Sequence, residues 1–169
     1  MSEPHIITRE EMIKSKGIGA SDVAAIMHLS PWQTAFELFE IKTGRRPKPP
    51  QTDAMKRGNE LEPIAFKEYC ELTGFAGEQQ VVAIHPELPY LRCIADGWDG
   101  KRLLEIKSPQ SKKLIESVRQ GIVPDNYILQ CAASMDIFGV DECDLYVFDA
   151  EGSELTTVYF SGLFLGTTL

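Results

Sequence analysis

The chain has 169 residues, of which 43% are hydrophobic and 25% charged, and these values exclude a disordered, collagen-like or low-complexity chain. A domain of this size buries about two thirds of its unfolded surface, so we expect a core that needs no disulfide or structural metal. The net charge of −8 argues against a general nucleic-acid coat protein. No apolar run approaches the ~18 residues of a membrane span. The first residues also lack the basic and apolar regions of a secretory signal, so we expect a cytoplasmic protein.

The charge is unevenly distributed along the chain. Residues 42–57 carry six basic residues and one acid, and residues 101–119 carry six basic residues and two acids. Residues 136–154 carry seven acids and no base. A surface polarised in this way can hold a polyanion on one side, and the alternative is two solvated basic loops beside an exposed acidic edge.

The first 44 residues predict two short helices. Ser21 or Asp22 is a suitable N-cap for a helix that runs to about His28. Residues 30–31, Ser-Pro, predict the start of a second helix because proline is favoured in the first helical turn. Gly44 ends this second helix.

A basic, proline-rich loop and a long helix follow. Residues 45–52 contain three prolines and three basic residues and cannot form regular structure. A helix is predicted from about Asp53 to Thr73, with Gly74 as its end. Pro63 falls inside this helix, so either the helix kinks there or it begins near Glu60.

The remaining chain alternates predicted strands and helices. The strands are 79–84, 90–95, 103–107, 144–149 and 155–160, with connections at 96–100 and 151–152, and the helices are 111–120 and 125–138. This order predicts a mixed α/β (α+β) domain around one sheet. We expect a single domain, with N-terminal helices and the basic loop in 1–52, a core in 53–149, and a C-terminal strand and short apolar tail in 150–169.

One strand carries a pattern with chemical meaning. In Glu105-Ile106-Lys107 the acid and the lysine lie on one face of the strand. The turn before it can bring the carboxylate of Asp96 beside Glu105, and carboxylates that converge repel each other unless a cation lies between them. Hard oxygen ligands of this type suit Mg²⁺ or Mn²⁺. The alternative is an ordinary Glu–Lys pair on a half-exposed strand.

The pattern lies within a longer series of ordered motifs. They are Gly19-Ala20-Ser21-Asp22, Ser30-Pro31-Trp32, Gly58-Asn59-Glu60-Leu61-Glu62-Pro63-Ile64-Ala65, Ala95-Asp96-Gly97, Leu104-Glu105-Ile106-Lys107-Ser108-Pro109 and Tyr127-Ile128-Leu129-Gln130. From about residue 14 to residue 149 the chain resembles the phage lambda exonuclease family, also called the YqaJ-like viral recombinases, within the PD-(D/E)XK nucleases. The proline of that name is Ala95 here.

The resemblance implies a set of catalytic and metal-binding residues. The implied metal ligands, for Mg²⁺ with Mn²⁺ as a substitute, are Glu62, Asp96, Glu105 and the carbonyl of Ile106. Lys107 resembles the lysine that orients or activates the attacking water, and Gln130 resembles the glutamine that supports the catalytic centre.

The resemblance also implies contacts with DNA phosphates. Ser21 resembles a serine that contacts the phosphate of a DNA end. The arginine that the family uses for a 5′-phosphate has no clear counterpart, and Lys14 or Lys16 lies near its place. Arg45, Arg46 and Arg57 lie in the basic segment 42–57 and are further candidates for phosphate contacts.

The implied function is a 5′→3′ exonuclease that acts on double-stranded DNA ends in a phage-type recombination system of a bacterial host. A single-strand annealing protein as partner and a homotrimer are part of the same implication. An endonuclease or nickase of the same fold and a non-catalytic DNA-end or protein-binding module stay open as alternatives. An iron–sulfur nuclease would need clustered cysteines, whereas Cys70, Cys93, Cys131 and Cys143 are dispersed.

Overall fold

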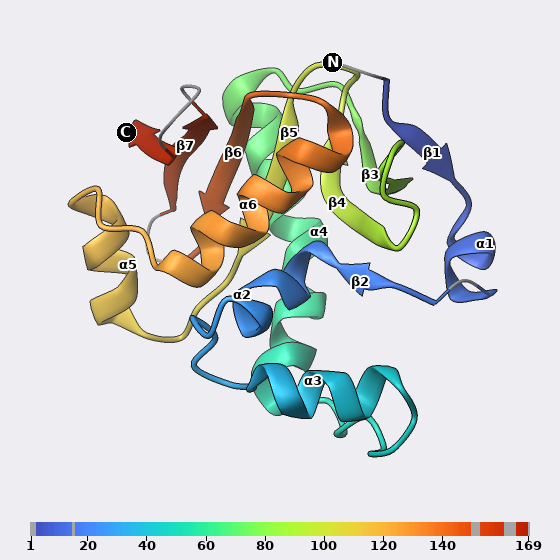
Figure 1. The fold of residues 1–169 in the computed structure, drawn as a ribbon. Coiled ribbons are helices and arrows are strands. Elements are labelled where there is room, and N and C mark those ends of the chain that lie inside the picture. Colours follow the sequence, from blue (N-terminus) through green and yellow to red (C-terminus); the bar gives the residue numbers. More distant parts are fainter. Residues whose placement is uncertain (1–2, 15, 150–152, 161–164, 169) are drawn as a thin grey trace.

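A computed structural model of the chain describes residues 3–14, 16–149, 153–160 and 165–168. Its centre is a mostly antiparallel sheet in the order β1-β3-β4-β5-β6-β7-β8, with β2 paired to β4 outside this path (Figure 1). The strands are β1 (His5–Ile7), β2 (Ile18–Gly19), β3 (Glu78–Ile84), β4 (Leu91–Trp98), β5 (Leu103–Lys107), β6 (Glu142–Val147), β7 (Glu154–Phe160) and β8 (Leu165–Thr168).

Helices cover both faces of this sheet. They are α1 (Arg9–Lys14), α2 (Val23–Ile26), α3 (Ala35–Lys42), α4 (Asp53–Thr73), α5 (Lys112–Arg119) and α6 (Asp125–Phe138), with a 3₁₀ turn at Ala20–Asp22 before α2. Helices α5 and α6 form the crossover between β5 and β6, which are parallel and therefore need a long connection. In Figure 1, α6 crosses one face of the sheet and α4 lies behind the opposite face.

Each covering helix has its own apolar core. On the α6 side the buried side chains include Leu103, Leu145 and Phe138, and on the α4 side they include Tyr69 and Leu104. Leu103 and Leu104 are neighbours in β5 and point to opposite faces, as the alternation of a strand requires. The strand β5 is therefore buried on both sides, which fixes its position between the two helices.

Strand β4 changes partner along one of its edges. It pairs with β5 at Gly97 and Trp98 and with β2 at Leu91 and Arg92. Between these points β4 and β5 diverge, and a fork opens between the two strands. Asp96 is the first residue of β4 beyond its last pair with β5, so it lies at the mouth of this fork.

Most of the predicted elements are confirmed, several of them to within one residue. The long helix is continuous from Asp53 to Thr73 with Pro63 inside it, and Gly74 ends it with φ of +69°. The helix at 125–138 and the strand at 103–107 have the predicted bounds. The mixed α/β class around one sheet is confirmed. The predicted turn at 151–152 lies outside the described residues.

Four predictions of local structure are wrong. The second helix begins at Ala35 with Thr34 as its cap, because the hydroxyl of Ser30 accepts from backbone N–H groups at 32 and 33 and forms a turn there. The predicted connection at 96–100 is strand as far as Trp98. The first short helix ends at Ile26 rather than about His28. Part of the predicted C-terminal tail, Leu165–Thr168, is strand β8, paired with β7.

The division of the chain into three parts stays a prediction, although all three parts contribute strands to the one sheet. Among the described residues, no helix has the length and apolar character that a membrane span requires. Three of the four free cysteines are buried, and Cys70 is partly exposed.

Candidate active site

The residues of the predicted acid–lysine pattern meet at the fork between β4 and β5. The carboxylate of Asp96 accepts a 2.7 Å hydrogen bond from the backbone N–H of Ile106. This side chain thus replaces the backbone partner that the diverging strand no longer provides. Glu105 is buried, with 3% of its surface exposed, on the face of β5 that α6 covers.

Lys107 is the centre of a hydrogen-bond network at this fork. Its ammonium group donates to Glu105 at 2.5 Å and to the amide oxygen of Gln130 at 3.0 Å. The amide nitrogen of Gln130, on α6, donates to the same oxygen of Glu105. The ammonium also lies 5.4 Å from the ring centre of Tyr127, one turn earlier on α6. Three groups thus hold one lysine in place.

The charges around Lys107 keep it protonated. Burial alone would lower the pKa of this lysine, but the carboxylates of Glu105 and Asp96 outweigh burial and raise the pKa well above its usual range. Lys107 is therefore suited to donate hydrogen bonds and to stabilise negative charge. It is poorly suited to accept a proton as a general base.

The surroundings of Asp96 disfavour its charged form, whereas those of Lys107 favour the charged form of the lysine. Burial and the neighbouring carboxylate of Glu105 raise its pKa well above the usual range. The carboxylate of Glu62 on α4 adds to this effect, whereas Lys107 opposes it. The fork therefore carries an excess of negative charge that one lysine does not neutralise.

The donor set suits a divalent cation in its chemistry. Glu62, Asp96 and Glu105 supply hard carboxylate oxygens that repel one another, and Mg²⁺ and Mn²⁺ prefer such ligands. Among the described residues, no three His, Cys, Asp or Glu side chains already form a metal-binding group. One oxygen of each acid already accepts a hydrogen bond from the protein. Asp96 accepts from the N–H of Ile106, and Glu62 accepts from the amide of Gln80. Glu105 accepts from both Lys107 and Gln130.

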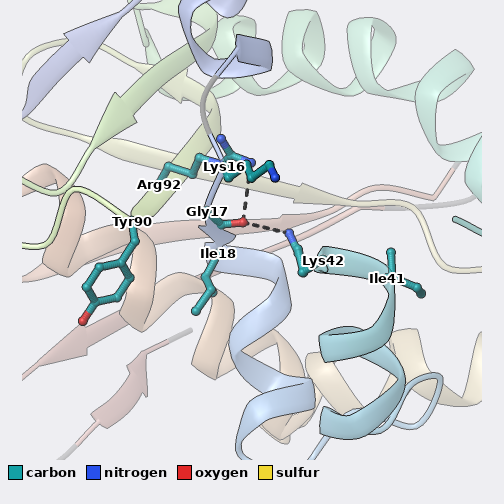
Figure 2. A pocket seen from close by; sticks show the side chains of 7 residues that line it. All are labelled: Lys16, Gly17, Ile18, Ile41, Lys42, Tyr90 and Arg92. Carbon is teal, nitrogen blue, oxygen red and sulfur yellow. Dashed lines mark hydrogen bonds between the residues drawn. The ribbon is translucent and has the colours of Figure 1, made fainter. Parts of the chain in front are cut away.

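A basic pocket lies beside β2, about 480 Å³ in volume. Figure 2 shows its lining, which is Lys16, Gly17, Ile18, Ile41, Lys42, Tyr90 and Arg92. Lys42 donates to the carbonyl of Gly17 at 3.1 Å and forms an ion pair with Asp22. Arg92 donates to the carbonyl of Met12 at 2.9 Å. Lys16 is exposed and has no ion pair within the part of the chain that the structure describes.

The other predicted phosphate contacts are spread over several elements. Ser21 is exposed in the 3₁₀ turn before α2. Lys14 is exposed on α1 and pairs with Glu10, and Arg46 pairs with two glutamates of α3. Arg45 lies over the ring of Phe39, and Arg57 donates to the carbonyl of Ser108. The structure therefore brings Glu105, Lys107 and Gln130 into one hydrogen-bonded group. Asp96 is hydrogen-bonded to the adjacent Ile106 and Glu62 lies near it, whereas these basic residues lie outside the group.

Sequence reasoning missed two residues, Gln80 beside Glu62 and Arg92 in the basic pocket, whereas Lys42 lies in the predicted basic segment 42–57. Gln80 contacts Glu62 through a strand position whose backbone has φ of +56°. Arg92 and Lys42 line the basic pocket. The sequence did contain a signal for Arg92. This residue lies four positions before Asp96 in the same strand, and that spacing puts both side chains on one face of a regular strand.

Comparison with known proteins shows which family and fold the chain resembles. A family model described as the YqaJ-like viral recombinase domain matches residues 11–141. The YqaJ protein of Bacillus subtilis (strain 168) is 32% identical over 139 residues, which are 79% of this chain and 43% of that protein. The chain thus spans less than half the length of this curated relative.

Solved structures share the fold. An alkaline exonuclease from Laribacter hongkongensis, LHK-Exo, superposes with a TM-score of 0.73 at 26% identity over 89% of this chain and 81% of that one. A phage-related exonuclease from Haemophilus somnus 129PT gives a TM-score of 0.59 at 14% identity over 78% of this chain and 67% of that one. The second likeness concerns the fold alone.

Proposed function

Because the chain belongs to the YqaJ-like viral recombinase family, we propose that it is a metal-dependent DNA nuclease that hydrolyses phosphodiester bonds. One observation carries this proposal. Lys107 is held by Glu105 and Gln130 beside the carboxylate of Asp96, at the point where two strands diverge. A group of buried and half-buried acids around a fixed, protonated lysine is suited to a reaction in which negative charge increases on phosphate oxygens.

Each residue of the group has a proposed part in the reaction. Lys107 contacts the attacking water or an oxygen of the phosphate and stabilises the charge that develops in the transition state. Gln130 fixes the direction of the Lys107 ammonium, since its amide bridges that ammonium and Glu105. Asp96 and Glu105, with Glu62 and the carbonyl of Ile106, would hold a divalent cation. That cation, Mg²⁺ or Mn²⁺, would neutralise phosphate oxygens and lower the pKa of the attacking water.

The phosphodiester bond is cleaved by addition of water at phosphorus and loss of the 3′ oxygen. The products are a 5′-phosphate and a 3′-hydroxyl. The basic pocket around Lys16, together with Lys14 and the exposed Ser21, is the proposed contact surface for phosphates near the reacting nucleotide. Arg45, Arg46 and Arg57 stay candidates for contacts with more distant phosphates.

We propose a 5′→3′ exonuclease on double-stranded ends as the mode of action. LHK-Exo, which has 26% identity to this chain, is an alkaline exonuclease, and this likeness favours the exonuclease over an endonuclease or nickase. A homotrimer, a single-strand annealing partner and a place in the cytoplasm of a phage-carrying bacterium belong to the same proposal. A non-catalytic DNA-end or protein-binding module is disfavoured by the intact group of acids and lysine.

The test is cleavage of linear and closed circular duplex DNA by the pure protein, with Mg²⁺ and with EDTA. Glu105→Gln serves as the inactive control. We expect degradation of the linear duplex alone, only with Mg²⁺, and not by the variant. Labels at the 5′ and 3′ ends then report the polarity.

Two results would overturn parts of the proposal. Cleavage of the circle would replace the exonuclease with an endonuclease. Binding of DNA ends without cleavage of either substrate, at any concentration of Mg²⁺ or Mn²⁺, would favour the binding module.

A further inference from the structure

Gln80 has an unusual backbone for its place in a strand. The pairs Gln79–Gly97 and Val81–Ala95 flank it, so Gln80 lies opposite Asp96 in the register of β3 and β4. Its φ of +56° is in the left-handed region, which glycine adopts readily and a residue with a long side chain does not. A glutamine kept in that conformation costs about 1 kcal/mol or more, so the surrounding structure must gain from its side chain.

Two contacts fix the orientation of the Gln80 amide. Its nitrogen donates to one carboxylate oxygen of Glu62 on α4. Its oxygen accepts from the guanidinium of Arg9 on α1 at 3.3 Å. A flipped amide would place its oxygen against the carboxylate and its N–H groups against the guanidinium, so both partners favour the same orientation.

Glu62 has few other restraints. Within the part of the chain that the structure describes, Gln80 is its one hydrogen-bond donor and Glu62 has no ion pair. Its donor Gln80 lies opposite Asp96 in the register of β3 and β4, so Glu62 lies beside the fork. The second oxygen of the Glu62 carboxylate is therefore left for a ligand.

We propose that Gln80 is a positioning residue of the cation site, which holds one oxygen of Glu62 so that the other points toward the ion shared with Asp96 and Glu105. The inference rests on the proposed function, because it takes Glu62 as a ligand of the catalytic ion. It assigns the positive φ of Gln80 a purpose, since the left-handed backbone turns the Gln80 side chain from the regular strand direction toward α4. Arg9 has a supporting part, since it holds the far side of the same amide.

The decisive variant is Gln80→Gly. Glycine relaxes the positive φ, so a residue with a merely structural role would leave the protein equally stable or more stable and would leave ion binding unchanged. If Gln80 positions Glu62, the apparent affinity for Mn²⁺ falls about 10- to 100-fold, as is typical when a group behind a metal ligand is lost. Titration calorimetry with Mn²⁺ and no DNA measures this affinity, and thermal unfolding of the ion-free protein measures stability.

Further variants separate the amide from the backbone. Gln79→Gly is the matched control, because it introduces glycine one position earlier in β3, where the backbone has an ordinary negative φ. It should leave the Mn²⁺ affinity unchanged. Gln80→Glu keeps the shape but sets a second carboxylate against Glu62, and we expect it to weaken Mn²⁺ binding at least as much as glycine. In cleavage assays Gln80→Gly should lower kcat with little change in KM for DNA.

The outcomes distinguish this inference from the proposed function. Unchanged Mn²⁺ affinity in both Gln80→Gly and Gln80→Glu overturns the role of Gln80 and leaves the nuclease proposal intact. Wild-type protein that binds Mn²⁺ but cleaves no DNA overturns the nuclease proposal, while the calorimetric comparison still decides the role of Gln80. Wild-type protein that binds no Mn²⁺ overturns both.

Discussion

The guanidinium of Arg57 donates a 2.8 Å hydrogen bond to the carbonyl oxygen of Ser108, which joins the first half of α4 to the segment directly after β5. Because β5 carries Glu105 and Lys107, this bond holds the end of the catalytic strand against α4. Arg57→Ala should lower the free energy of unfolding by about 1.5–3 kcal/mol, the usual contribution of a hydrogen bond that involves a charged group. Urea unfolding measures the change.

The matched control is Arg45→Ala. Arg45 lies 4.9 Å from the ring centre of Phe39 on an exposed surface, and its loss should cost less than about 1 kcal/mol. If Arg57→Ala is as stable as Arg45→Ala, and its DNA binding depends less on salt than that of the wild-type protein, then Arg57 contacts phosphate rather than Ser108 in solution.

Replacement of Glu105 by glutamine should abolish cleavage without unfolding the protein. Glutamine keeps the shape of this buried side chain, and Lys107 keeps the acid of Asp96 as a neighbouring negative charge. We expect kcat to fall at least 10²- to 10³-fold, the size of effect seen when a group that stabilises the transition state is lost. Glu116→Gln is the control, because Glu116 is half-exposed on α5 and pairs only with surface groups. An active Glu105→Gln protein of full purity would remove this residue from the site.

Alkaline pH should destabilise the fold through Tyr146. Burial and the hydrogen bond to Glu68 raise the pKa of Tyr146 to about 12. Because the folded pKa lies above the unfolded value of about 10, this contribution is complete below pH 10 and decreases as the pH rises toward 12. Urea unfolding at a series of alkaline pH values measures the loss. Tyr146→Phe should be less stable at neutral pH and should lose less stability over that range, and an unchanged alkaline loss in this variant would contradict the assignment.

Pro63 lies in the interior of α4, directly after Glu62. Proline lacks an N–H group, so it leaves the carbonyl of Asn59 without its helical donor. Pro63→Ala should therefore raise the free energy of unfolding by about 1–3 kcal/mol. If the proline also directs Glu62 toward the fork, Mn²⁺ affinity should fall in the same variant, whereas higher stability with unchanged affinity would limit Pro63 to a local effect.

Elements with clear local signals could be predicted from the sequence. The helix at 53–73 has a long amphipathic pattern and a glycine at its end, and β5 is a short apolar run between turn residues. Elements without a local signal could not be predicted in this way. β1 and β2 have three and two residues, and neighbouring strands far along the chain supply their hydrogen bonds. Local sequence contains no information about such partners.

The residues of the candidate site also differ in whether local sequence predicts them. The strand period places Glu105 and Lys107 on one face, and the preceding turn brings Asp96 near them, so these three residues follow from local geometry. Gln130 lies 23 residues after Lys107 and was assigned through the resemblance to a family. The sequence contains no signal for Gln80. Its contact with Glu62 depends on a positive φ, and nothing in the polar strand segment around this glutamine indicates such a backbone conformation.

The two outermost strands of the sheet, β1 and β8, come from opposite ends of the chain, and each covers the edge of a longer strand. A bare edge presents a row of backbone donors and acceptors that can pair with a strand of another molecule. Removal of residues 1–8 would remove β1 and expose the backbone edge of β3. This edge lies on the opposite side of β4 from the fork between β4 and β5. Such a shortened protein should aggregate, through edge-to-edge association of intact sheets, under conditions in which the fork itself is still folded.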